Sequence, residues 1–136
     1  MTPALPEGRT GDALRILIAE DNAVNAELLL FMLDGMGCPA HAVVNGAEAV
    51  EALRRQVYDV VFMDVQMPVM DGIEAARLIR LEWGPTRRPR IIALTAGVMS
   101  EEVQACRDAG MDDFLSKPLS IESLATAIAS CRHLQG

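Results

Sequence analysis

The segment VVFMDVQMPVMDG, residues 60–72, carries the strongest indication of the fold. It begins with four apolar residues that run without interruption up to Asp64. A continuous apolar run, unlike an alternating one, is typical of a central strand in a parallel sheet that helices cover on both faces. Residues 15–19, RILIA, have the same character and also end at an acidic residue. These two segments are predicted to form the centre of a parallel sheet.

Short β-rich runs alternate with longer helical patterns on both sides of this segment. Such alternation is typical of βα units, in which right-handed helical connections join parallel strands. The expected strands are residues 15–19, 40–44, 60–63, 91–94 and 114–115. The prediction is therefore an α/β protein, a compact three-layer sandwich of a parallel sheet between helices.

Apolar residues recur at helical spacing between these strands, so each connecting helix is expected to place one apolar face on the sheet. The last helix shows the pattern best, with Ser120 as its expected N-cap and Glu122 in its first turn. The recurring apolar positions are Leu29, Met32, Leu33 and Met36; Val50, Leu53 and Val57; Ile73, Ala76, Leu78 and Ile79; and Ile121, Leu124, Ala125, Ile128 and Ala129.

The chain of 136 residues has the length of one ordinary domain. Residues 1–13 contain prolines and glycines but no apolar block, so they are expected to form a disordered lead-in rather than a secretory signal. The folded domain is expected over residues 14–134. The sequence leaves open whether this domain stands alone or was cut from a larger protein.

Composition excludes several classes of function. A net charge of −7 would repel a phosphate backbone, so direct binding to nucleic acid is not expected. The longest apolar run, residues 28–33, is too short to span a membrane. The three cysteines have neither zinc-site spacing nor a CxxC pair, which favours reduced thiols in the cytoplasm.

Polar and charged residues stand where the expected strands end. Glu20 and Asp21 follow the first strand, Asp64 the third, Thr95 the fourth and Lys117 the fifth. In open α/β sheets, ligands bind at the carboxyl ends of the strands. If the first and third strands are neighbours, three carboxylates converge, and a hard divalent cation such as Mg²⁺ would relieve their repulsion. The set indicates a phosphoryl-handling site, although each residue alone also fits a solvated loop end.

With these residues in this order, the sequence resembles the receiver domains of response regulators, the family of the bacterial chemotaxis regulator and of the receivers attached to hybrid histidine kinases. The resemblance covers about residues 15–134. It rests on Glu20 and Asp21 in IAEDN, the D-x-x-M-P-x-M-D-G run from Asp64 to Gly72, Thr95-Ala96 and Lys117-Pro118. It implies a flavodoxin-like receiver fold, with a five-stranded parallel sheet in the order 2-1-3-4-5 and five helices.

The resemblance also implies roles for the matching residues. Asp64 would be the phosphoacceptor, whose carboxylate takes a phosphoryl group from a phosphohistidine on a partner protein. Mg²⁺ would be held by Asp21, Asp64 and the backbone carbonyl of Gln66, while Glu20 would act through a coordinated water. Phosphoryl transfer depends on in-line positioning and on neutralised charge, which Mg²⁺ and Lys117 would supply.

The switch residues implied by the family pattern are Thr95 and Phe114. The Thr95 hydroxyl would be drawn toward the phosphoryl group, and Phe114 would rotate inward as Thr95 moves, changing an output surface on the fourth helix, fifth strand and fifth helix. A plain core aromatic is an equally open interpretation of Phe114. The Lys117-Pro118 bond is expected to be cis, as in the family.

The first helix is apolar on more than one stripe, because Val24, Leu28 and Phe31 lie beside the set that should face the sheet. In the family, this helix docks against a histidine kinase or a histidine phosphotransfer protein. The surplus stripe therefore predicts a partner surface, and the alternative is a helix that is simply well buried.

Other functions fit the sequence less well. A phosphatase of the haloacid dehalogenase type needs a second Asp two residues after its nucleophile, where this chain has Gln66. A flavodoxin-like cofactor site needs a loop of amide donors after the first strand, where EDNAVNAE places negative charge. A pseudo-receiver that acts without phosphorylation is the remaining alternative.

The expected protein is a signalling phosphoacceptor and not an enzyme that acts on other substrates. It is expected to be a monomer or a phosphorylation-dependent homodimer.

Overall fold

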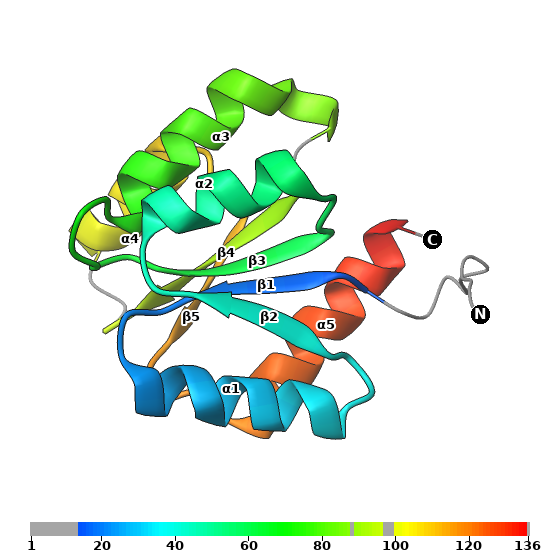
Figure 1. The fold of residues 1–136 in the computed structure, drawn as a ribbon. Coiled ribbons are helices and arrows are strands. Elements are labelled where there is room, and N and C mark those ends of the chain that lie inside the picture. Colours follow the sequence, from blue (N-terminus) through cyan, green and yellow to red (C-terminus); the bar gives the residue numbers. More distant parts are fainter. Residues whose placement is uncertain (1–13, 88, 97–99, 136) are drawn as a thin grey trace.

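The computed structural model describes residues 14–135 except 88 and 97–99, and the predicted lead-in lies outside this part. Its centre is a five-stranded parallel sheet in the order β2-β1-β3-β4-β5, with helices on both faces (Figure 1). The predicted three-layer architecture and strand order are confirmed. No described helix is both long enough and apolar enough to cross a membrane. The elements are β1 Ile16–Ala19, α1 Ala23–Gly35, β2 Ala40–Val43, α2 Gly46–Arg55, β3 Val60–Asp64, α3 Gly72–Arg87, β4 Arg90–Thr95, α4 Ser100–Asp108, β5 Asp113–Ser116 and α5 Ile121–Gln135.

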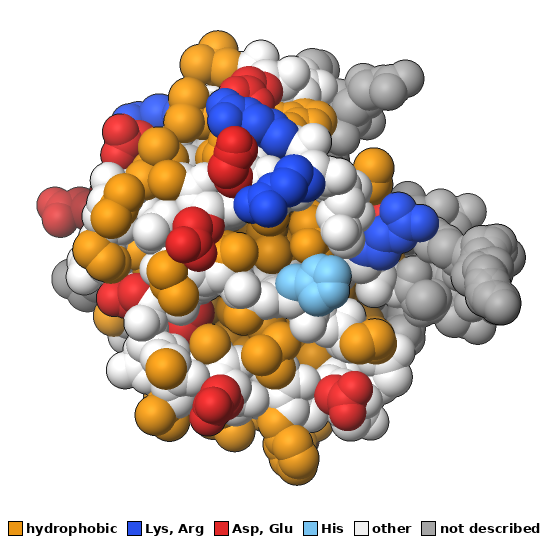
Figure 2. All heavy atoms as spheres, in the orientation of Figure 1, with side chains coloured by type: hydrophobic (Ala, Val, Ile, Leu, Met, Phe, Trp, Pro, Cys, Tyr) orange, Lys and Arg blue, Asp and Glu red, His pale blue; other side chains and the backbone are white. Residues whose placement is uncertain are grey.

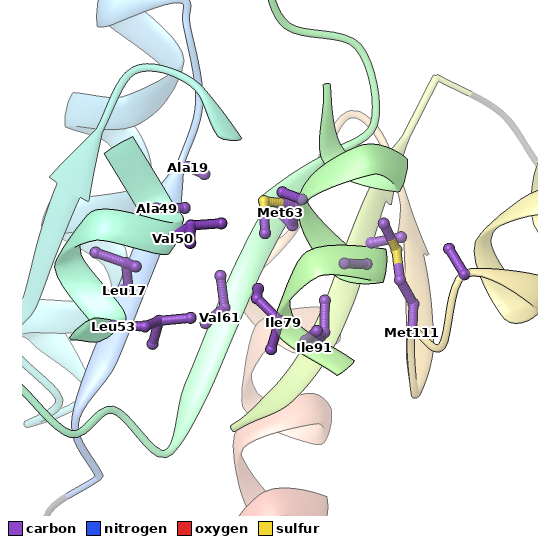
Figure 3. Close-up of a cluster of buried hydrophobic side chains, with 14 of the residues drawn as sticks. Leu17, Ala19, Ala49, Val50, Leu53, Val61, Met63, Ile79, Ile91 and Met111 are labelled. Atoms are coloured by element: carbon purple, nitrogen blue, oxygen red, sulfur yellow. The ribbon is translucent and has the colours of Figure 1, made fainter. Parts of the chain in front are cut away.

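The sheet separates two apolar cores, because successive residues of a strand point to opposite faces. Leu17 and Val61 pack with apolar residues of α2, α3 and α4 on one face (Figure 3). Ile18 and Phe62 pack with residues of α1 and α5 on the other face. Both β1 and β3 are buried along their whole length, as their continuous apolar runs predicted.

Polar caps fix the helix starts close to the strand ends. The side chains of Asn22 and Asn45 each accept a hydrogen bond from the backbone N–H three residues later, at 3.0 and 2.8 Å. Ser120 accepts an equivalent bond at 3.0 Å, which confirms it as the N-cap of α5. Because Asn22 follows the end of β1 by three residues, its cap holds the short turn that carries Glu20 and Asp21.

Two details of the helix predictions are wrong. Val57 lies outside α2 and is exposed, because the backbone is already extended at Gln56, with φ −155° and ψ 162°. In α5 the alanine-rich pattern did not predict which face is buried, because alanine is apolar but its small side chain contributes little free energy when it is buried. The buried side consists of Leu124, Ala127, Ile128 and Cys131, whereas Ile121, Ala125 and Ala129 are exposed.

The three cysteines, Cys38, Cys106 and Cys131, are buried thiols. Burial raises the pKa of Cys106 and of Cys131. A raised pKa lowers the fraction of reactive thiolate, so these two side chains are structural parts of the core.

Two glycines hold the loop between β3 and α3 against the end of β3. The N–H of Gly72 donates to the carbonyl of Val65 at 2.9 Å, and a Cβ on Gly72 would clash with the backbone oxygen of Asp64. The N–H of Gly46 donates to the carbonyl of Met70 at 2.8 Å, and a Cβ there would lie 2.7 Å from that oxygen. The absence of a side chain at both positions therefore allows the loop after Asp64 to close tightly.

Replacing Gly72 with Ala is expected to lower the free energy of unfolding by about 1–3 kcal/mol, because the new methyl group meets backbone that cannot move aside. Gly35→Ala is the matched control, since a Cβ at Gly35 meets nothing within 4 Å and alanine favours the helix. Urea denaturation measures both variants. Equal stability changes would contradict this account of the loop.

Candidate functional site

Three carboxylates meet at the carboxyl ends of β1 and β3. The two strands pair in parallel with Ala19 opposite Met63, so the next residues, Glu20 and Asp64, come side by side. Carboxylate oxygens of Glu20, Asp21 and Asp64 lie within 4.8 Å of one another. Glu20 and Asp64 are 2% and 6% exposed, while Asp21 faces solvent. The convergence expected from the sequence is present.

Lys117 reaches this acidic cluster from the end of β5. Its Nζ lies 3.0 Å from Asp64 Oδ2 and 3.2 Å from Glu20 Oε1. Its backbone N–H donates to the carbonyl of Thr95 at 2.8 Å, and the Lys117-Pro118 bond is cis, as predicted. Lys117 is also the only lysine in the chain. One ammonium therefore faces three carboxylates.

The pKa values reflect this imbalance of charge. Burial raises the pKa of Glu20 and the nearby charge of Asp64 adds to it, although the backbone N–H of Asn22 and the Lys117 ammonium act in the opposite direction. Burial alone would lower the pKa of Lys117, but its hydrogen bond to Asp64 and the nearby charges of Asp64 and Glu20 outweigh the effect of burial and raise that pKa. Lys117 is therefore held in its charged form, and the carboxylates still lack positive charge.

The donor set fits a hard divalent cation such as Mg²⁺. Glu20 Oε1 is buried, and among the described residues it has an ion pair with Lys117 Nζ at 3.2 Å but no hydrogen-bond partner. Within the described part of the chain, Asp64 Oδ1 accepts one long hydrogen bond, 3.3 Å, from the backbone N–H of Gln66. These all-oxygen groups, with open coordination capacity, match the preference of Mg²⁺ for carboxylates, carbonyls and water.

A small hollow of about 140 Å³ opens beside the phosphoacceptor candidate, with Asp64, Gln66, Ala96 and Lys117 in its wall. Ala96 is small, so it leaves room next to Asp64. Glu102, from the first turn of α4, also lines the hollow. The sequence analysis missed Glu102, because it lies seven positions beyond Thr95 and only the placement of α4 brings it to the site.

The two predicted switch residues lie on neighbouring strands, Thr95 on β4 and Phe114 on β5. Thr95 is fully buried, and its hydroxyl is 3.4 Å from the carbonyl of Leu115, a long hydrogen bond to β5. Phe114 is half-buried against the core, and the guanidinium of Arg107 lies 5.4 Å from the centre of its ring. Thr95 therefore contacts the strand that carries Phe114.

The apolar stripe predicted on α1 is on the surface. Val24, Leu28 and Phe31 are 72%, 53% and 77% exposed, so the alternative of a fully buried helix is wrong for this stripe. Leu28 also lines a groove of about 380 Å³ that runs to Lys117. On the face shown in Figure 2, basic side chains lie over the half that contains α2 and α3, and α1 itself has no lysine or arginine.

Sequence comparison gives the family of this site. The response regulator receiver domain profile matches residues 16–129. Hybrid signal transduction histidine kinase G of Dictyostelium discoideum is 44% identical over 117 residues, which are 85% of this chain and 3% of that protein. The sensor histidine kinase GacS of Pseudomonas protegens is 41% identical over 119 residues, which are 85% of this chain and 13% of that protein. The chain thus spans a small part of these relatives.

Solved structures agree with this result. The receiver domain of the sensor histidine kinase PA1611 from Pseudomonas aeruginosa, with a magnesium ion in its active-site cleft, is 38% identical, with a TM-score of 0.81 and 89% and 98% of the two chains covered. The receiver domain of Ssk1 from Saccharomyces cerevisiae, bound to the histidine phosphotransfer protein Ypd1, is 29% identical, with a TM-score of 0.82 and coverage of 90% and 91%. This chain belongs to the response regulator receiver domain family, as the resemblance implied.

Replacing Lys117 with Met should destabilise the protein when EDTA removes divalent cations, by about 1–3 kcal/mol, because two buried carboxylates lose their only ammonium. Adding Mg²⁺ should reverse part of the loss. Arg54→Met is the control, because it removes only exposed ion pairs, with Glu82 and Glu51, and should cost less stability than Lys117→Met, independent of Mg²⁺. Urea unfolding with EDTA or MgCl₂ measures this, and a loss that Mg²⁺ does not change would contradict the charge account.

Proposed function

We propose that Asp64 is the residue that accepts the phosphoryl group. Its carboxylate oxygen attacks the phosphorus of a phosphohistidine on a partner protein. The P–N bond breaks as the new P–O bond forms, its electron pair stays on the imidazole nitrogen, and that nitrogen takes up a proton from solvent. The observation that carries this proposal is the position of Lys117 Nζ, within 3.2 Å of both Asp64 and Glu20, beside a third carboxylate.

Asp21, Asp64 and the backbone carbonyl of Gln66 would hold Mg²⁺, and Glu20 would bind it through a water. When bound, Mg²⁺ supplies positive charge next to the oxygens of the phosphoryl group. Lys117 supplies a second positive charge and has three donors to share between Asp64 and a phosphoryl oxygen. The small side chain of Ala96 keeps the approach to Asp64 open.

The switch proposed for this chain uses Thr95 and Phe114. A phosphoryl oxygen is a stronger acceptor than the Leu115 carbonyl, which the Thr95 hydroxyl meets at 3.4 Å. Turning that hydroxyl toward Asp64 would vacate space next to β5 and let Phe114 move inward, away from Arg107. The surface of α4, β5 and α5 would then carry the output.

The partner that fits the site is a histidine kinase or a histidine phosphotransfer protein. Its phosphohistidine has to come within bonding distance of Asp64, so its surface must cross the rim formed by α1 and the connection after β5. That rim holds the exposed apolar stripe of α1 and a groove lined by Leu28, Pro118 and Leu119. The receiver of Ssk1, which shares this fold, was solved with such a protein.

The wider proposal is a receiver unit over residues 14–134 that works in the cytoplasm, where its buried thiols stay reduced and its donor is found. Its only catalysis would be its own phosphorylation and dephosphorylation. The unit would be a monomer or would dimerise when phosphorylated, and it would not bind nucleic acid directly, given its net charge of −7. The alternative is a pseudo-receiver, which would not gain a phosphoryl group in a labelling experiment.

Incubation with acetyl phosphate and Mg²⁺ should add one phosphoryl mass to the wild-type protein, as measured by intact-mass spectrometry. Asp64→Asn should abolish the gain, because the amide is not a nucleophile, and should leave the fold intact. Asp21→Asn should reduce the gain by weakening the metal site.

Asp108→Asn is the control for lost negative charge, because Asp108 lies at the far end of α4 and is exposed. This variant should be labelled like the wild type. Labelling of Asp64→Asn at the wild-type level would refute the site. No labelling of the wild type, even by a phosphorylated histidine phosphotransfer protein, would favour the pseudo-receiver.

Replacing Phe31 with Ala should slow phosphoryl transfer from a phosphorylated histidine phosphotransfer protein, with Ypd1 as the first donor, by about tenfold or more, as expected for a central apolar contact. Labelling by acetyl phosphate should not change, since that donor needs no docking surface. Leu81→Ala is the matched control, because Leu81 is 81% exposed but lies on α3. Equal rates for the two variants would argue against docking on α1.

A further inference from the structure

The hollow beside Asp64 has one wall that the mechanism above does not use. Glu102 lines it together with Asp64, Gln66, Ala96 and Lys117. Glu102 is half-buried, whereas its neighbour Glu101 is exposed, although both stand in the first turn of α4. Of the two acidic residues in this turn, Glu102 therefore lines the hollow and Glu101 is exposed to solvent.

We propose that Glu102 is a fourth carboxylate of the phosphoacceptor site, whose charge disfavours the phosphorylated state and so sets its lifetime. The inference rests on the proposed function of Asp64. Glu102 does not take part in the bond changes. It acts through the charge that it adds to the space into which the phosphoryl group must enter.

A count of charges shows why Glu102 matters. Glu20, Asp21 and Asp64 carry three negative charges, which one Lys117 and one bound Mg²⁺ balance. Phosphorylation replaces the single charge of the Asp64 carboxylate with a group that carries nearly two. With no positive charge left over, each further negative charge in the hollow raises the energy of the phosphorylated site.

The position of Glu102 on α4 strengthens this effect. The first turn of a helix favours negative charge, because its backbone N–H groups are unsatisfied and the helix dipole is positive there. A phosphoryl group next to α4 would benefit from that same end of the helix. Glu102 already occupies it, so the phosphoryl group and Glu102 compete for the same stabilisation.

The test compares Glu102→Gln with Glu101→Gln and with Glu102→Asp. Each protein is phosphorylated with acetyl phosphate and Mg²⁺, freed of donor by desalting, and followed by intact-mass spectrometry. In the forward step acetate leaves as the P–O bond to Asp64 forms, and in the decay water takes the phosphoryl group as inorganic phosphate. Glu102→Gln should gain phosphoryl faster and keep it longer, each by about three- to tenfold, as expected for removing one nearby charge that solvent partly screens. Glu101→Gln and Glu102→Asp should behave like the wild type.

Two readouts separate a charge effect from a structural one. Raising the salt concentration to about 1 M should shrink the difference between Glu102→Gln and the wild type, because ions screen a partly exposed charge. Both Gln variants remove one acidic group from the first turn of α4, so their thermal unfolding midpoints should agree. A lifetime difference that salt does not change, or that follows the unfolding midpoint, would overturn the inference.

The remaining outcomes are distinct. If the wild type is labelled at Asp64 but Glu102→Gln decays at the rate of Glu101→Gln, only the role of Glu102 is overturned. If Glu102→Gln loses phosphate faster than the wild type, the sign is wrong and the inference fails. If the wild type accepts no phosphoryl group from acetyl phosphate or from a phosphorylated histidine phosphotransfer protein, the proposed function fails and the inference fails with it.

Discussion

Two buried carboxylates at the ends of adjacent parallel strands share a single ammonium, and the sheet with its helices has to hold this unfavourable arrangement in place. Glu20 and Asp64 follow paired residues of β1 and β3, and Lys117 reaches both from β5. Such a cluster is unfavourable in isolation, because burial and like charge both oppose ionisation. It persists because a large apolar sheet and its helices hold the strand ends in place. The uncompensated negative charge is what makes the site suited to a divalent cation.

The scaffold reaches the site through short and rigid connections. The Asn22 cap starts α1 directly after the acidic turn, and Gly72 lets the chain close against the backbone of Asp64. Both apolar cores lie directly beneath, since β1 and β3 contribute alternate residues to each. The catalytic geometry is therefore supported by regular elements on both sides of the sheet, which limits how far any one carboxylate can move away from its neighbours.

The site lies between two surfaces with different properties. On one side, α1 exposes an apolar stripe next to the groove that leads to Lys117. On the other side, α4 places Glu102 in the hollow and Arg107 over the ring of Phe114. A change of charge at Asp64 would therefore act on both ends of α4. At the start of the helix it would repel Glu102. At the end of the helix it would act through Thr95 and Phe114, whose ring lies next to Arg107. Under the proposed function, entry of the phosphoryl group and its readout would use separate faces.

The sequence by itself determined the architecture and the groups that meet at the candidate site. Continuous apolar runs indicated buried parallel strands, and Glu20, Asp21, Asp64, Thr95 and Lys117 all stood at expected strand ends, because local pattern and chain order are written in the residues. Local pattern failed where apolar character did not decide burial, as at Val57 and on the alanine-rich face of α5. Only the tertiary structure decided that Lys117 bridges Asp64 and Glu20, that Phe31 is exposed, and that Glu102 lines the hollow. These facts depend on how separate elements pack against one another, and spacing along the chain does not specify the rotation of one helix relative to a distant strand.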